Sequence, residues 1–169
     1  NSFKNLKEPE DGWMSWNFIP LTRAIKDAFK GLLMIMPFVL LVTWLVTLIF
    51  GEQGGSNPLL EMVLKSKDLT SLIILFTTTV IIAPLFEEFI FRGVLLPALV
   101  DPLGRIFAVI VSAFVFAVAH LSVGEVAPLF VLGIGLGVMR VSSGRLSSCV
   151  MMHSVWNGVT FLNLLILAI

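Results

Sequence analysis

The amino-acid sequence predicts an all-α integral membrane protein. Hydrophobic residues make up 57% of the 169 residues and charged residues only 13%, with a mean hydropathy of +1.01, whereas a soluble domain has about 25% charged residues. Eleven basic and eleven acidic side chains balance, so the net charge gives no indication of nucleic-acid binding. The single cysteine excludes an internal disulfide. One membrane domain is therefore expected.

Five apolar stretches are expected to be its transmembrane helices. The first has twenty residues without a charge, which is about the length that a helix needs to cross the hydrocarbon core of a bilayer. Turn signals at residues 101–104 and 142–145 end the second and fourth stretches. The expected helices cover residues 31–50, 69–100, 105–121, 128–141 and 146–169.

A shorter amphipathic segment precedes the first stretch. Apolar and charged side chains alternate in helical spacing over residues 18–30, a pattern typical of a helix that lies in the membrane interface. We therefore expect an N-terminal segment over residues 1–30 and a transmembrane bundle over residues 31–169. Because the sequence starts with asparagine rather than methionine, the natural chain is expected to begin further upstream.

Basic residues near the ends of the stretches predict the orientation in the membrane. Lys65 and Lys67 would lie on one side, and six other basic residues would lie on the opposite side. Because cytoplasmic loops are enriched in lysine and arginine, we expect the N-terminal side of the bundle to face the cytoplasm. The six residues are Arg23, Lys26, Lys30, Arg105, Arg140 and Arg145.

Two adjacent carboxylates, Glu87 and Glu88, lie inside the second apolar stretch. Residues 69–86 contain no ionisable side chain, and none follows Arg92 until Asp101. A charge near the centre of a bilayer costs about 3 kcal/mol or more, so charged residues there generally have a functional reason. The pair is therefore the first candidate for a functional site.

The turn at residues 101–104 brings a histidine to the depth of these carboxylates. Glu87 and Glu88 precede the centre of the turn by 16 and 15 residues, and His120 follows it by 17. Because a helix rises about 1.5 Å per residue, the three side chains should lie at similar depth in an antiparallel hairpin. Phe116 lies one turn before His120 and gives the imidazole an aromatic neighbour.

The last apolar stretch carries a second polar pair, His153 and Asn157, which share one helix face at i,i+4 spacing. They follow Gly144 by nine and thirteen residues, so Asn157 is expected closer in depth to the glutamates, while helix tilt could also bring His153 to them. Glu88 and Arg92 have the spacing of an ion pair. Each pair alone is explained by structural bonds between helices, but their convergence in one small bundle favours a functional site.

The chemistry of this set points to hydrolysis. A carboxylate beside an imidazole can deprotonate water for attack on a carbonyl group, and a second histidine with an asparagine amide can stabilise the oxyanion. Zinc bound by Glu87, His120 and His153 is the alternative, since these residue types bind zinc. However, adjacent helical residues point about 100° apart, so Glu87 and Glu88 do not easily share an ion, and no HExxH motif is present. We therefore favour a mechanism without a cofactor.

Three motifs resemble those of the CPBP family, which comprises the CAAX proteases and bacteriocin-processing enzymes and is also called Abi. Residues 87–93 are similar to its EExxxR motif, residues 116–120 to its FxxxH motif and residues 153–157 to its HxxxN motif. The motifs occur in the family's order, and the resemblance covers about residues 69–164. It implies an all-helical membrane bundle with a four-helix catalytic core over that range.

The resemblance also implies roles, substrates and a location. Substrates would be membrane-embedded or lipid-modified proteins or peptides in contact with the lipid bilayer. Bacterial members, including cyanobacterial and plastid ones, are the most similar, so we expect a bacterial plasma membrane or a thylakoid, where the N-terminal side would be stromal. The implied roles are water activation by Glu87 and His120, support from Glu88, Arg92 and Phe116, and oxyanion binding or substrate orientation by His153 and Asn157.

The sequence thus predicts an intramembrane endopeptidase that cleaves a membrane-associated protein or peptide with a water activated by glutamate and histidine. One alternative is a non-catalytic scaffold or assembly partner of a membrane protein complex, and a weaker one is a transporter with a proton relay. The intact set of motif residues favours catalysis. Gly133, Gly135 and Gly137 lie within an apolar stretch and follow no strand, which favours helix packing over nucleotide binding.

Overall fold

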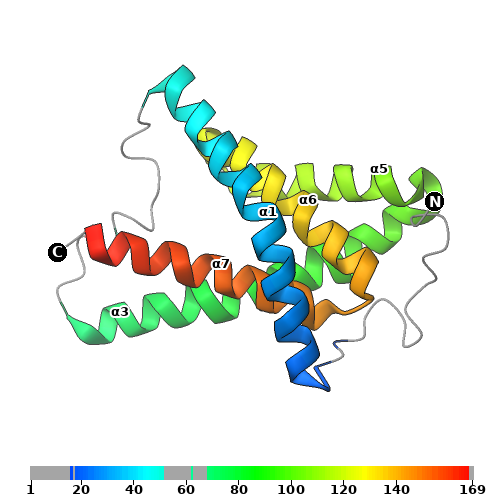
Figure 1. Ribbon diagram of the computed structural model, residues 1–169, viewed down its shortest axis with the longest axis horizontal. Helices are drawn as coiled ribbons and strands as arrows, with labels where there is room; N and C mark the ends of the chain where they lie inside the picture. Colours follow the sequence, from blue (N-terminus) through cyan, green and yellow to red (C-terminus); the bar gives the residue numbers. More distant parts are fainter. Residues whose placement is uncertain (1–15, 17, 52–61, 63–67, 168–169) are drawn as a thin grey trace.

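The computed structural model describes Trp16, residues 18–51, Met62 and residues 68–167, and all regular structure in these residues is helical (Figure 1). The expected polar connection with Lys65 and Lys67, and most of residues 1–17, lie outside the described residues. The main elements are α1 (Leu21–Phe50), α3 (Leu69–Phe76), the π-helical η2 (Thr77–Ile82), α4 (Ala83–Glu88), the π-helical η3 (Phe89–Leu95), α5 (Leu96–Ala119), the 3-10 turn η4 (Val123–Glu125), α6 (Val126–Ser143) and α7 (Leu146–Leu167).

The helical run Leu69–Ala119 folds back at Gly104, as the turn signal predicts. Gly104 has φ 73° and ψ 162°, a conformation that glycine adopts without the steric cost of a side chain. The arm before it and the part of α5 after it run in opposite directions (Figure 1). Within the described residues, four helical stretches are long and apolar enough to cross a membrane. The bend at Gly104 divides one of them into two antiparallel parts, which confirms the predicted hairpin at this turn.

Residues 18–30 do not form a separate interfacial helix. α1 begins at Leu21 and continues through the first apolar stretch as one helix of 30 residues, about 45 Å long at 1.5 Å per residue, which exceeds the roughly 30 Å of the hydrocarbon core. The helix continues through Gly31, where the side chains of Met139 and Met152 fill the space beside the backbone. The amphipathic segment is thus the polar end of a long membrane helix.

Two π-helical turns, η2 and η3, flank α4. Each is followed by a proline, Pro84 or Pro97, that is the second residue of the next α-helix. Proline has no N–H to donate, and its ring clashes with the carbonyl group four residues earlier. In both turns the residue before the proline donates its N–H to the carbonyl five residues earlier, which widens the helix. Such turns are frequent at functional sites, and α4 carries Glu87 and Glu88.

Small residues bring α6 close to its neighbours. A β-carbon at Gly133 would lie 3.1 Å from Ala113, and one at Gly137 would lie 2.9 Å from Val109, so both glycines face α5. Gly135 faces α1 instead. These contacts confirm the packing role that the glycine spacing predicts.

α7 lies along the first arm and runs opposite to it. Phe161 packs edge-on against Phe76 with the ring centroids 5.4 Å apart, and it is buried together with Val80 of η2. α1 packs across α6 and α7 (Figure 1). The arrangement places His153, near the middle of α7, against the carboxylates of α4.

The first arm begins at a capped helix end. The side chain of Asp68 accepts hydrogen bonds from the N–H of Ser71 at 2.9 Å and from its hydroxyl group at 2.7 Å. These two hydrogen bonds hold the pKa of Asp68 below its usual value. The cap satisfies a backbone donor in the first turn of α3.

Candidate active site

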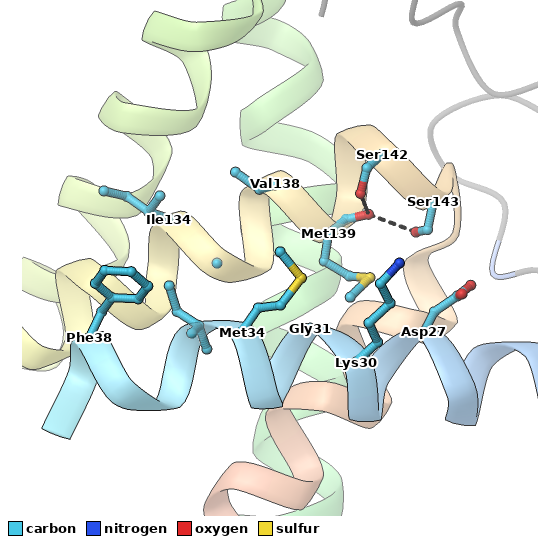
Figure 2. Close-up of a pocket in the computed structure, with 12 residues that line it drawn as sticks. Asp27, Lys30, Gly31, Met34, Phe38, Ile134, Val138, Met139, Ser142 and Ser143 are labelled. Carbon is cyan, nitrogen blue, oxygen red and sulfur yellow. Dashed lines mark hydrogen bonds between the residues drawn. The ribbon is translucent and has the colours of Figure 1, made fainter. Parts of the chain in front are cut away.

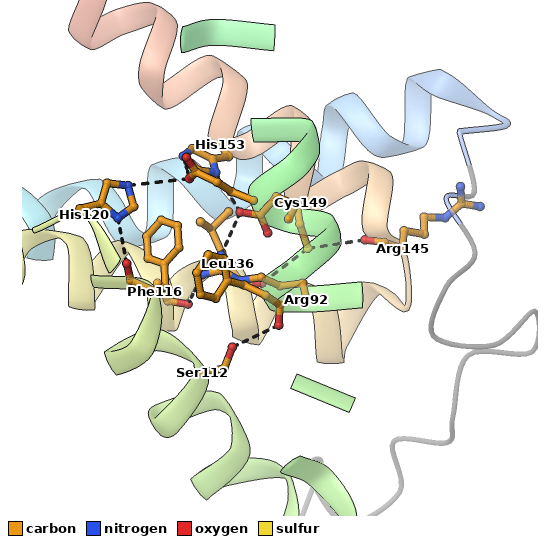
Figure 3. A network of polar contacts seen from close by, with 12 residues as sticks. Arg92, Ser112, Phe116, His120, Leu136, Arg145, Cys149 and His153 are labelled. Atoms are coloured by element: carbon orange, nitrogen blue, oxygen red, sulfur yellow. Dashed lines mark hydrogen bonds and ion pairs between the residues drawn. The ribbon is translucent and has the colours of Figure 1, made fainter. Parts of the chain in front are cut away.

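Glu88 is buried in a tight cluster of charged side chains. Its Oε1 accepts hydrogen bonds from Arg92 Nη1 at 3.0 Å and from His153 Nδ1 at 2.8 Å, and the three side chains are at most 2% exposed. Figure 3 shows Arg92 and His153 converging from η3 and α7. The ion pair that the i,i+4 spacing predicts is therefore present, and His153 is its further partner.

Two further contacts hold the Arg92 guanidinium group in place. Its Nη2 donates to the carbonyl oxygen of Gly133 at 3.1 Å. Its guanidinium carbon lies 4.4 Å from the centroid of the Phe116 ring, a cation–π contact. The same ring contacts His120 edge-on at 4.7 Å, as the spacing predicts. Phe116 thus supports both the arginine and the histidine.

Glu87 lies outside this cluster, in a more open space between two histidines. Its Oε2 is 3.8 Å from His120 Nε2 and 3.7 Å from His153 Nε2, which confirms the predicted meeting of Glu87 and His120. The side chains of Glu87 and His120 are 30% and 27% exposed, whereas His153 is only 2% exposed. The Glu87 Oε2 atom itself is buried and has no hydrogen-bond partner among the described residues. Both separations are longer than a direct hydrogen bond, so this oxygen faces the two imidazoles without bonding to either.

Both histidines turn Nε2 toward Glu87 because the Nδ1 atom of each is already bonded. His120 Nδ1 lies 2.8 Å from the carbonyl oxygen of Phe116 (Figure 3), and His153 Nδ1 lies 2.8 Å from the Glu88 carboxylate. A carbonyl and a carboxylate can only accept hydrogen bonds, so each Nδ1 carries a proton. Each Nε2 therefore accepts when its ring is neutral and donates when the ring is an imidazolium.

Asn157 connects α7 to η2. Its Nδ2 donates to the carbonyl oxygen of Thr79 at 2.9 Å. This carbonyl has no helical donor, because Ala83 donates its N–H to Thr78, and Pro84, five residues after Thr79, has no N–H. The π-helical turn that the proline imposes thus creates the acceptor that Asn157 uses.

One depth prediction is wrong. Asn157 was expected closer to the glutamates than His153, yet His153 contacts both carboxylates and Asn157 lies at η2. The number of residues from a turn gives the relative depth only if the helices are parallel and both turns lie at the same level. In the structure the helices cross at angles (Figure 1). The π-helical turns and the Gly133 contact of the arginine were not predicted either. Pro84 and Pro97 were the available signal for the turns.

The alternative zinc ligands come together in space. Glu87, His120 and His153 are zinc-binding residue types, and bonded Nδ1 atoms are common among metal-binding histidines. However, no group of three His, Cys, Asp or Glu side chains in the described part of the chain is placed to hold a metal ion. The O–N separations of 3.7 and 3.8 Å also exceed the roughly 3.4 Å that ligand bonds of about 2.05 Å give in a tetrahedron. The donor types fit zinc and the spacing does not.

A model of the family described as type II CAAX prenyl endopeptidase Rce1-like matches residues 69–159, more than half of the chain. The chain belongs to this family. The match runs from the start of α3 into α7 and supports a protease-type function for the Rce1-like chain. It contains all six polar motif residues, which are Glu87, Glu88, Arg92, His120, His153 and Asn157.

The Rce1-like chain is also similar to the membrane-embedded CAAX protease MroQ of Staphylococcus aureus (strain USA300), with 27% identity over 159 residues. The match covers 90% of this chain and 59% of MroQ, so the chain spans about three fifths of the length of that relative. No solved structure matches the chain. Its apolar helices and its family make it a multi-pass membrane protein.

Proposed function

We propose that the Rce1-like chain is an intramembrane endopeptidase in which Glu87 activates a water molecule. The observation that carries this proposal is the buried Glu87 Oε2 atom, which has no hydrogen-bond partner among the described residues and faces the Nε2 atoms of His120 and His153. A water in this space would donate to the carboxylate and to one imidazole and keep a lone pair for attack. The family match supports peptide hydrolysis as the chemistry.

In the proposed reaction, the oxygen of this water bonds to the carbonyl carbon of the peptide while one O–H bond breaks. The proton passes to Glu87, and the carbonyl π electrons move to the carbonyl oxygen, which gives a tetrahedral oxyanion. When the carbonyl re-forms, the C–N bond breaks and Glu87 returns the proton to the leaving amine. His120 orients the water through Nε2. General base catalysis of this kind contributes about 10²- to 10⁴-fold.

The Glu88 cluster would prepare His153 to stabilise the oxyanion. The hydrogen bond of Nδ1 to Glu88 fixes the ring, and Nε2 faces Glu87 at 3.7 Å. When the ring carries a second proton, Nε2 would donate to the oxyanion. We assign Asn157 to positioning, because its amide group ties α7 to η2.

The proposed substrate is a membrane-embedded or lipid-modified protein or peptide. Glu87 lies well inside an apolar helical stretch that is long enough to cross the membrane, so a bond that reaches it must come from a chain within or at the bilayer. MroQ is named a CAAX protease, and CAAX-type proteins are therefore the first class to test. A plasma membrane or thylakoid location, with the N-terminal side cytoplasmic or stromal, remains a prediction from the sequence.

A comparison of membrane proteomes tests the proposal. Cells would carry the wild-type chain, Glu87→Ala or Asp101→Asn, which removes an exposed carboxylate near the turn of the same arm. We expect at least one membrane protein or peptide to accumulate uncut in Glu87→Ala membranes alone. If Glu87→Ala membranes match wild type while partner proteins co-purify unchanged, the chain is a scaffold rather than a protease.

Metal analysis of the purified, active protein tests the absence of a cofactor. We expect cleavage to survive chelation and zinc to be far below one ion per chain. A stoichiometric zinc ion whose removal abolishes cleavage would replace the proposed mechanism with one in which Glu87, His120 and His153 bind the metal.

A further inference from the structure

A groove separate from the catalytic cluster runs between α1 and α6, with a volume of about 550 Å³ (Figure 2). Gly135 lines it, and its missing side chain lets Ile35 of α1 pack directly against the backbone of α6. The two ends of the groove differ in polarity. Asp27, Lys30, Ser142 and Ser143 line one end, and Met34, Phe38, Ile134 and Val138 line the other.

The groove has the length of one bilayer leaflet. From Asp27 to Phe38 the axis of α1 rises by about 16 Å, which is about half of the 30 Å hydrocarbon core. Along this length the lining changes once, from charged to apolar. A phospholipid in that leaflet has the same polarity, with its headgroup at the membrane boundary and its acyl chains toward the centre.

The polar end carries one charge of each sign. Figure 2 shows Lys30 and Asp27 next to each other at this end of the groove, and no ion pair joins them within the described residues. Asp27 Oδ2 accepts a hydrogen bond from Ser148 at 3.4 Å, which orients the carboxylate. A headgroup that contains both a phosphate and a primary ammonium complements this pair, because Lys30 can donate to the phosphate and Asp27 can accept from the ammonium.

We propose that this groove binds one phosphatidylethanolamine from the leaflet that contains the N-terminal end of α1. The phosphate binds Lys30, the ammonium binds Asp27, and an acyl chain lies along Met34, Phe38 and Val138. The lipid fills the space between α1 and α6 and thereby stabilises the bundle. The site is independent of the proposed hydrolysis, since none of its lining residues belongs to the Glu87 and Glu88 cluster.

Native mass spectrometry of the detergent-purified chain tests the proposal with three added lipids of matched acyl chains. Phosphatidylcholine keeps the phosphate but has no N–H donor, and phosphatidylglycerol has no amine. We expect one phosphatidylethanolamine per chain, bound about tenfold more tightly than either. Asp27→Asn should remove the preference over phosphatidylcholine, and Lys30→Ala should weaken the binding of all three lipids.

A second test fills the groove with a larger side chain and compares it with a matched control variant. Val138→Trp should abolish the bound lipid, whereas Leu40→Trp, at an exposed position of α1 that does not line the groove, should retain it. Phosphatidylethanolamine should raise the unfolding temperature of wild type and Leu40→Trp but not of Val138→Trp. Equal retention of the three lipids, or unchanged retention by Val138→Trp, would overturn the proposal in favour of annular lipid only. So would equally tight binding of glycerophosphoethanolamine, which has no acyl chains.

Discussion

Glu87 and Glu88 are neighbours in sequence and lie in opposite environments. Glu88 is fully buried, with hydrogen bonds of 2.8 and 3.0 Å to a histidine and an arginine. Glu87 is 30% exposed and lies no closer than 3.7 Å to the two imidazoles it faces. Glu88 therefore holds the surrounding side chains in place, whereas Glu87 remains available to water and substrate. Catalytic sites need both functions, because a reactive group works only in a fixed geometry.

Helix geometry produces this difference. Adjacent residues of a helix point about 100° apart, so Glu88 faces Arg92 and His153, while Glu87 also faces His120 at the end of α5. The π-helical turns on both sides of α4 set the rotation of this short segment relative to the rest of the arm. The site therefore has a buried half around Glu88 and a more open half around Glu87 and His120. We make separate predictions for the two halves.

The largest stability effect is expected for Arg92→Met, which leaves the Glu88 carboxylate buried without its guanidinium partner. Breaking a buried ion pair in this way costs about 3–5 kcal/mol. Unfolding in detergent, followed by circular dichroism, measures the loss. Lys26→Met, which removes an exposed cation of α1, is the control and should change stability by less than about 0.5 kcal/mol. Equal losses in the two variants would contradict a structural role for the buried half.

The two histidines should respond differently to the same substitution. His153→Leu removes a buried hydrogen bond to a carboxylate and should cost about 1.5–3 kcal/mol. His120→Leu alters a partly exposed side chain and should cost less, about 1 kcal/mol, while cleavage falls by about 10²-fold or more. Paired unfolding and cleavage measurements check this. A His120→Leu protein less stable than His153→Leu would reverse the assignment of the two halves.

A smaller effect is expected for Asn157→Ala, which leaves the carbonyl oxygen of Thr79 without a donor. The expected loss is about 1 kcal/mol. Pro84→Ala restores an N–H five residues after Thr79, so the combined variant should lose less stability than the sum of the two single variants. A double-mutant cycle of unfolding free energies measures this coupling, and strict additivity would argue against the link between the π-helical turn and Asn157.

Much of this arrangement could be predicted from local patterns in the sequence. Apolar length predicts the membrane helices, the glycine at position 104 predicts the turn, and i,i+4 spacing predicts the contact of Glu88 with Arg92. Glu87 and His120 lie at similar distances from the turn along the sequence. This spacing correctly predicts that they meet, because both residues belong to the same hairpin.

The remaining features depend on packing between hairpins, which the spacing of residues does not encode. The depth of His153 relative to the glutamates follows from the crossing angles of α7, and the carbonyl contact of Arg92 follows from the close approach of α6 at Gly133. The π-helical turns had a local signal in Pro84 and Pro97, but a proline in a helix predicts a kink or a break as readily as a widened turn.

The most direct test of the division between the two carboxylates compares Glu87→Gln with Glu88→Gln. Each variant removes one negative charge and keeps the size of the side chain, at neighbouring positions of one helix. The asymmetry predicts that Glu87→Gln unfolds at the wild-type temperature and cleaves at least about 10²-fold more slowly, whereas Glu88→Gln unfolds at a clearly lower temperature. A Glu87→Gln protein that still cleaves, or a Glu88→Gln protein as stable as wild type, would contradict it.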